Sequence, residues 1–224
     1  MRFSRNATVA KIRAIYGKRL KPENYKELIT KKSVSEVAEY LKRNTRYSGV
    51  LANIDTNDIH RGFLEDILTK SNFELYVNLC KFQNLDEEPF YRFLIELHEI
   101  EEILDAILYL NAGLSGSYIS DLPSFLLSKA SFDLLEIAKI RSFKELLTVL
   151  NKTDYYNVLR DIKEDENFNV DFMECEVKLR THYLKKFLKI VERDFTGYAK
   201  EELKHQIEVQ VDLINIINTY RMKS

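Results

Sequence analysis

The sequence is poor in residues that interrupt helices. Its 224 residues include only 6 Gly and 3 Pro, which leaves few places for tight turns and favours long, continuous helices. It also has only two cysteines, Cys80 and Cys175, which lie too far apart in the sequence for a CxxC pair. We expect two buried, reduced thiols in a reducing compartment.

Neither sign of charge is in excess, and no long apolar run is present. The 34 basic and 35 acidic residues give a net charge of -1, which argues against a nucleic-acid-binding protein. No stretch approaches the roughly 18 apolar residues of a transmembrane helix. The first fifteen residues carry several basic side chains and no apolar run, so they do not resemble a secretory signal. We therefore expect a cytoplasmic protein that contacts a membrane only through partners.

What the sequence does contain is apolar residues at helical spacing along almost its whole length. The hydrophobic fraction is 45%, enough for a sizeable core. Ser33 and Glu36 form a capping-box pattern at the start of one helix. Long helices are predicted over about 58–81 and, after a turn at 84–89, over a segment that includes 93–107. The predicted fold class is all-α.

Several short patterns recur in the second half of the chain in the same order. The matching pairs are segments 33–36 and 142–145, segments 45–51 and 153–159, Ile54 and Ile162, and Glu102 with Asp105 and Asp212 with Asn215. We interpret them as a divergent repeat. Residues 1–112 form helical module 1, 113–123 a linker and 124–224 helical module 2. Each module is expected to contain short capped helices followed by a long antiparallel helix pair.

No pattern of catalytic, cofactor-binding or metal-binding residues emerges. His98 shares a helix face with Glu101 and Glu102, but a carboxylate-bridged metal site in a helical bundle needs two such clusters. The glycine-containing segment 113–117 lacks the Lys-Ser/Thr pair of a phosphate-binding loop. We therefore predict no catalytic residue, no cofactor and no metal.

A few residues are candidates for contact with a partner protein. His60 and Arg61 lie at the start of the first predicted long helix, and Gly113 and Gly116 lie in the linker. The alternatives for His60 and Arg61 are contact with an anion, or a capping and surface role. For the linker glycines the sequence offers no further indication of function.

Four segments resemble a known family. They are Asn6-Ala7 followed by Lys11-Ile12-Arg13-Ala14 and Leu20, then Tyr25-Lys26-Glu27-Leu28, then Thr45–Leu51, and finally Glu208 followed by Asp212-Leu213-Ile214-Asn215 and Tyr220-Arg221. Together they span the chain and are similar to the C-type subunit of V-type (A-type) ATPases, a family related to the d-type subunit of the eukaryotic V-type enzyme. The arrangement in modules supports the same resemblance.

The resemblance implies a non-catalytic central-stalk subunit of a rotary ATPase that transports protons or sodium ions. Such a subunit is a funnel of helical modules around a pseudo-threefold axis. Its partners are the rotor shaft subunits and the proteolipid of the membrane rotor ring. The family has three modules and only two are recognisable before Ser224, so we expect the third module to be absent from this sequence.

Three other functions remain open at this stage. A general helical-repeat scaffold for protein interactions would share the same architecture. An all-helical, metal-dependent enzyme would require a metal site that the spacing does not predict. A lipid-surface protein is the least favoured, because the sequence lacks a basic amphipathic helix.

Overall fold

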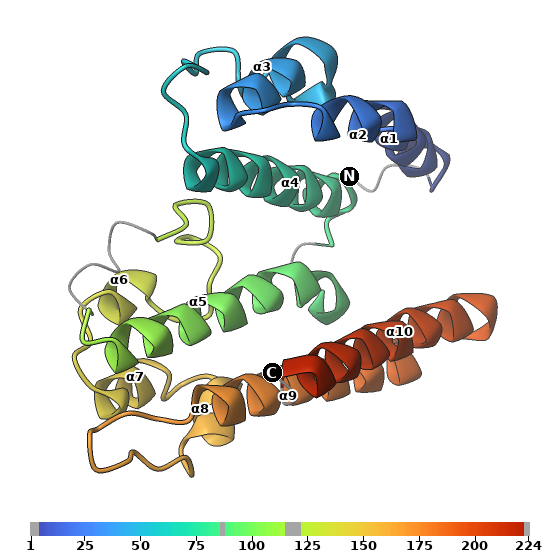
Figure 1. Ribbon diagram of the computed structural model, residues 1–224. Coiled ribbons are helices and arrows are strands. Elements are labelled where there is room, and N and C mark those ends of the chain that lie inside the picture. Colours follow the sequence, from blue (N-terminus) through green and yellow to red (C-terminus); the bar gives the residue numbers. More distant parts are fainter. Residues whose placement is uncertain (1–4, 86–87, 115–121, 222–224) are drawn as a thin grey trace. The chain divides into compact units, whose positions relative to one another are not determined.

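A computed structural model describes residues 5–85, 88–114 and 122–221 (Figure 1). These residues form helices joined by turns and loops, and the described part of the chain contains no β-strand. The predicted all-α fold class is therefore confirmed. The repeat and the funnel arrangement stay predictions.

The chain divides into two compact units, residues 1–87 and 88–224, which we call the N-terminal and the C-terminal unit. The helices of the N-terminal unit are α1 (Arg5–Gly17), α2 (Pro22–Ile29), α3 (Val34–Asn44), the short 3-10 helix η1 (Arg46–Ser48) and α4 (Arg61–Gln83). The C-terminal unit contains η2 (Pro89–Arg92), α5 (Phe93–Asn111), α6 (Leu134–Ile137), α7 (Phe143–Val149), α8 (Asp154–Leu159), α9 (Phe172–Asp194) and α10 (Gly197–Arg221).

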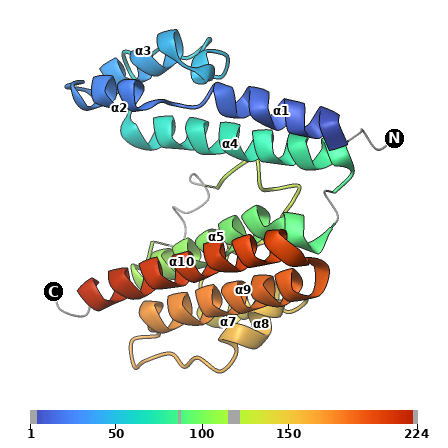
Figure 2. The ribbon, with the colours of Figure 1, turned by 90° about the vertical axis from the view of Figure 1, so that its right-hand side faces the viewer.

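The N-terminal unit has its core where α3, η1 and the beginning of α4 meet. The buried residues there are Ala38, Leu41, Tyr47, Leu51, Ile59 and Leu64. Helix α1 lies along the far part of α4 (Figure 2). The Lys11 ammonium is 4.1 Å from the centre of the Phe82 ring, and the Gln83 side chain donates a hydrogen bond to the Thr8 hydroxyl. The N-terminal unit thus has a small apolar core, and α1 contacts α4 outside that core.

The C-terminal unit is organised around the long helix α9. Helices α9 and α10 form a hairpin, and α5 packs against α9 (Figures 1 and 2). The α5 residues Ile100, Ile103 and Ile107 recur at helical spacing and are almost fully buried, as is Leu179 of α9. Gly197 begins α10 at φ +60°, a backbone conformation that glycine adopts without steric cost. The short helices α6, α7 and α8 complete the unit.

The two long predicted helices are present at closely similar positions. The helix predicted over 58–81 is α4, and the segment that includes 93–107 is α5. Between them Asn84 has φ +53° and follows the end of α4, as a left-handed C-terminal residue commonly does.

The compact units do not divide where the predicted modules do. The sequence repeat predicts a boundary at 113–123, whereas the first compact unit ends at residue 87 and the second begins at residue 88. The physical reason is that α5, which the repeat assigns to module 1, buries its apolar side against α9 and so belongs to the C-terminal unit. A repeated sequence and a packed unit are different divisions of a chain, so the modules stay a prediction. Part of the predicted linker, residues 115–121, lies outside the described residues.

Two short helices begin with the same hydrogen-bonded cap. The Ser33 hydroxyl accepts the N–H of Glu36 at 3.2 Å, and the Ser142 hydroxyl accepts the N–H of Glu145 at 3.3 Å. Each glutamate reaches back to the N–H of the residue before its serine, at 3.0 and 2.8 Å. The caps occupy matching places in the predicted repeat and satisfy backbone donors that the helix leaves unpaired.

Ser33→Ala and Ser142→Ala should each lower the free energy of unfolding by about 1 kcal/mol, because each removes an acceptor for a helix N-terminal N–H. Urea unfolding followed by circular dichroism measures the effect. Ser35→Ala, inside the first turn of α3, is the control and should leave stability nearly unchanged. Equal losses in all three variants would contradict the assigned caps.

Candidate functional site

The structure gives local roles to the predicted interface residues His60 and Arg61. The His60 ring nitrogen Nδ1 accepts the N–H of Phe63 at 3.2 Å, which makes His60 the N-terminal cap of α4. The exposed Arg61 guanidinium lies 2.7 Å from the Glu65 carboxylate one turn further along the helix. Both residues are exposed, so they are also accessible to a partner.

The two predicted linker glycines are placed differently. Gly113 lies in the C-terminal unit just after α5, has φ +69°, and donates its N–H to the Leu110 carbonyl at 3.0 Å. It therefore helps to end that helix. Gly116 lies outside the described residues.

Sequence reasoning missed a polar cluster inside the C-terminal unit. It lines a cavity of about 220 Å³ and comprises Arg92, Glu96, Glu99, Asp154, Tyr155 and Lys186. Its members come from η2, α5, α8 and α9. Charged groups of both signs are thus collected from segments far apart in the sequence.

Glu99 is the most buried member, with 1% of its surface exposed. One carboxylate oxygen accepts the N–H of Ser131 at 2.5 Å, and the other accepts the Tyr155 hydroxyl at 2.7 Å. The Arg92 guanidinium is 3.6 Å away. Burial raises the pKa of Glu99 above its ordinary value, and these three neighbours oppose the shift. Burial and the Glu99 carboxylate also raise the pKa of Tyr155, which keeps its hydroxyl protonated as a donor.

A second set of contacts links the cluster to α9. The Lys186 ammonium lies 2.9 Å from Glu96 and 3.5 Å from Asp154. His182 Nε2 is 4.0 Å from the Asp154 carboxylate and is buried without a hydrogen-bond partner among the described residues. Burial lowers the pKa of His182, although Asp154 opposes the shift, and this favours the neutral imidazole.

A buried carboxylate with a raised pKa beside a cavity is a typical feature of acid–base sites. In this cluster, however, the oxygens of Glu99 are bound by donors of the protein itself, and Lys186 bridges two carboxylates. The contacts connect α5, α8 and α9. The arrangement is therefore best suited to holding the helices together.

One feature of the sequence could have indicated the cluster. Glu96 and Glu99 are one helical turn apart, and the neighbouring Ile95, Ile100 and Ile103 form the buried side of α5. Two carboxylates among such residues require buried partners. The partners themselves could not be identified, because Tyr155 and Lys186 lie far along the chain.

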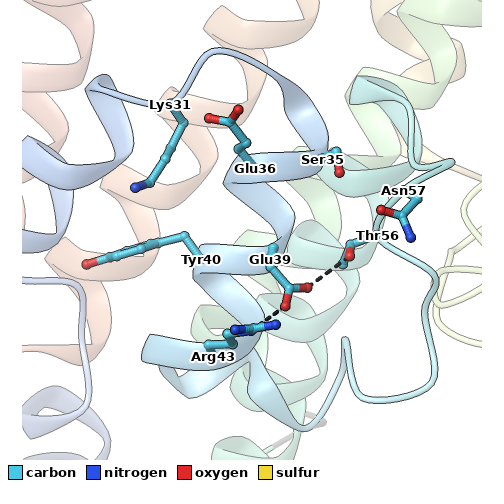
Figure 3. A pocket seen from close by; sticks show the side chains of 8 residues that line it. All are labelled: Lys31, Ser35, Glu36, Glu39, Tyr40, Arg43, Thr56 and Asn57. Atoms are coloured by element: carbon cyan, nitrogen blue, oxygen red, sulfur yellow. Dashed lines mark hydrogen bonds and ion pairs between the residues drawn. The ribbon is translucent and has the colours of Figure 1, made fainter.

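An open pocket of about 650 Å³ lies on α3 in the N-terminal unit (Figure 3). At its centre the Glu39 carboxylate accepts the Thr56 hydroxyl at 2.9 Å and pairs with Arg43. These contacts, with the Thr56 hydrogen bond the largest, lower the pKa of Glu39. The Lys31 ammonium is 5.2 Å from the centre of the Tyr40 ring on another side of the pocket. The contacts of Glu39 fix the loop that contains Thr56 to α3.

The C-terminal unit also contains an aromatic cluster beside the α9–α10 hairpin. The ring centres of Phe90 and Phe195 are 4.8 Å apart, and those of Tyr183 and Phe187 are also 4.8 Å apart. The cluster borders a mostly apolar cavity of about 200 Å³ that α10 closes with Leu203, Gln206, Ile207 and Gln210. These rings add packing between η2, α9 and the turn that leads into α10.

Part of α10 exposes apolar side chains. Leu213 and Ile216 are 55% and 54% exposed, and Tyr220 is 75% exposed. Together with Val209 they recur at helical spacing and lie on one face, which we call the α10 stripe.

The two cysteines are buried, and neither forms a disulfide bond within the described part of the chain, in line with the expected reduced thiols. Burial raises the pKa of Cys175 to about 12, so its thiol is not a nucleophile at neutral pH.

His98 Nδ1 lies 2.9 Å from the Glu101 carboxylate. Among the described residues, no group of three or more His, Cys, Asp or Glu side chains is arranged to hold a metal ion. None of the described helices combines the length and the apolar character needed to cross a membrane.

Tyr155→Phe should lower the free energy of unfolding by about 1–3 kcal/mol, because it leaves a buried oxygen of Glu99 without its donor. Urea unfolding measures the loss. Tyr156→Phe, the neighbouring and less buried tyrosine, is a matched control that should change little. If the two variants were equally stable, the proposed role of the Tyr155 hydroxyl would be wrong.

Glu99→Gln should change how stability depends on pH. The raised pKa means that the folded protein holds the Glu99 proton more tightly than the unfolded chain, whose Glu pKa is about 4.5. The stabilisation from Glu99 is therefore present below pH 4.5 and is lost as the pH rises through the raised pKa. Because glutamine does not titrate, the variant should gain stability relative to the wild type between low and neutral pH. Unfolding free energies measured across this range would contradict the shift if their difference were constant.

Comparison with known proteins identifies a family that covers most of the chain. The family model described as the ATP synthase (C/AC39) subunit matches residues 8–224. No curated protein and no solved structure matches the chain.

Proposed function

The chain belongs to the ATP synthase (C/AC39) subunit family and is thus a subunit of a V/A-type ATPase, and we propose that it is a non-catalytic central-stalk subunit that couples the rotor shaft to the membrane rotor ring. The observation that carries this proposal is the extent of the family match. Residues 8–224 include almost all of both compact units, so the relationship does not depend on one local motif.

The packing of the C-terminal unit supports a mechanical role. A subunit that transmits torque must resist bending, and close-packed helices deform little. Here α9 packs against both α5 and α10, and the Glu99–Tyr155 and Glu96–Lys186 contacts add polar connections from α5 to α8 and to α9. Satisfied buried networks of this kind make a core more rigid.

The α10 stripe supports a role in assembly. Contiguous exposed apolar residues on a protein surface commonly mark a protein–protein interface. Its aromatic member, Tyr220, is of a type enriched among the residues that dominate binding energy. We therefore assign the stripe to contact with another subunit of the ATPase.

In this proposal the partners are the rotor shaft subunits and the proteolipid of the membrane rotor ring. The subunit lies on the cytoplasmic side and contacts the membrane through the ring. It contributes to proton or sodium transport by joining the two rotating parts, whereas ion passage and ATP hydrolysis belong to other subunits. His60, Arg61 and Gly113 remain candidates for additional partner contacts.

Affinity purification of the tagged protein from gently solubilised native membranes should recover shaft subunits and the rotor-ring proteolipid, identified by mass spectrometry. Leu213→Glu with Ile216→Glu should reduce this recovery at least about tenfold, because charges then oppose burial of the stripe. Asn215→Glu with Thr219→Glu adds the same charge to exposed polar positions of α10 and serves as the control.

Recovery of soluble regulators without any ATPase subunit would instead support a general helical scaffold. Recovery of ATPase subunits that is unaffected by the Leu213 and Ile216 changes would keep the proposed role and contradict the assigned surface. The purified chain alone should not hydrolyse ATP, and robust turnover would overturn its non-catalytic role.

A further inference from the structure

The net charge of the whole chain is close to zero, but its two units carry net charges of opposite sign. Residues 1–87 contain 16 basic and 11 acidic residues, whereas residues 88–224 contain 18 basic and 24 acidic residues. The net charges are therefore +5 and -6. The positive excess is concentrated in the first 46 residues, which contain 13 basic and 4 acidic residues. An anionic partner would be attracted to this part of the chain.

A pocket of about 550 Å³ lies within this basic region, where α1 ends, α2 begins and α3 leads into η1. We call it the basic pocket. Its lining includes four cationic side chains, Lys18, Arg19, Lys21 and Arg46, and no Asp or Glu. Uncharged hydrogen-bonding side chains complete it, namely Asn24, Asn44, Thr45 and Ser48.

Some cations of the N-terminal unit pair with a carboxylate, whereas among the described residues the pocket cations do not. Arg61 pairs with Glu65 at 2.7 Å, and Lys31 lies 3.5 Å from Glu27. Within the described residues, none of the four pocket cations forms an ion pair with a carboxylate. Like charges gathered without counter-charges repel one another, and a bound anion would remove that repulsion.

Two of the four cations are held in place by neighbouring groups. The Arg19 guanidinium donates to the Tyr16 carbonyl at 3.0 Å and lies 3.7 Å from the centre of the Tyr16 ring. The half-buried Arg46 donates to the Tyr47 hydroxyl at 3.1 Å and to the Asn72 side chain. A fixed, planar guanidinium matches the geometry of phosphate oxygens better than a mobile ammonium does.

The exposed Lys18 and Lys21 complement these fixed groups. Their flexible side chains can follow an anion that the guanidinium groups position. The α2 helix begins at Pro22 beside them, so the partial positive charge of a helix N-terminus adds to the same field.

We propose that the basic pocket binds an anion that carries two or more phosphate groups. A phosphate monoester has a charge of about -1.5 to -2 at neutral pH, so two such groups balance four cations. The volume lies in the range of small-molecule sites, roughly 300–1,000 Å³. The same chemistry could come from a soluble polyphosphorylated compound or from the headgroup of a phosphorylated lipid. The inference is independent of the coupling role proposed above.

Isothermal titration of the full chain with pyrophosphate tests the soluble source. Flotation with phosphatidylcholine vesicles, with and without phosphatidylinositol bisphosphate, tests the lipid source. Lys18→Gln with Lys21→Gln should weaken binding at least about tenfold, because each change removes a charge-assisted contact. Both lysines are exposed, so circular dichroism should show an unchanged fold.

Lys26→Gln with Lys32→Gln is the matched control. It removes two exposed positive charges from the same unit but from outside the pocket, and should change binding by less than about twofold. Binding of either phosphate probe that is lost only in the Lys18 and Lys21 variant supports the proposal and identifies the source. Equal losses in both double variants would show a diffuse charge effect and overturn it. Failure of both probes, or binding of a poly-glutamate peptide in their place, would also overturn it.

Discussion

Burial of α5 against α9 is the constraint on which the C-terminal unit depends. It places Ile100, Ile103 and Ile107 in the core, and the same helix brings Glu99 into a region where a carboxylate needs protein donors. Ser131 and Tyr155 supply those donors. Packing of α5 against α9 therefore requires hydrogen-bond donors for Glu99. The two kinds of contact together connect distant parts of the sequence in one packed unit.

This packing gives a physical basis for the proposed role. A coupling subunit needs a body that resists deformation and surfaces that remain available to partners. The buried network serves the first need, while the α10 stripe leaves Leu213 and Tyr220 exposed for the second. The N-terminal unit differs in character, because its excess positive charge and the basic pocket suit an anion better than an apolar partner.

Much of the local structure could be predicted because its causes lie close together in the sequence. Ser33 and Glu36 predict a cap within one helical turn, and Asn84 ends a long helix through its own backbone conformation. The polar cluster could not be predicted in the same way. Glu99 and Tyr155 are far apart in the sequence although they are hydrogen-bonded in the folded unit, and nothing in the intervening pattern pairs them. His60 is an intermediate case: its place at the start of α4 indicates a capping role, but the structure is needed to show that its Nδ1 accepts the N–H of Phe63.

The sequence by itself determined the helical fold class and the approximate positions of the long helices, because both depend on composition and short-range spacing, and its motifs carried the resemblance to the family. Only the tertiary structure decided that α5 belongs with α9, that the chain divides after residue 87, and that Lys18 and Arg46 line one pocket. These features depend on which apolar faces meet. Helical periodicity shows that a face must be buried but does not specify the helix that buries it.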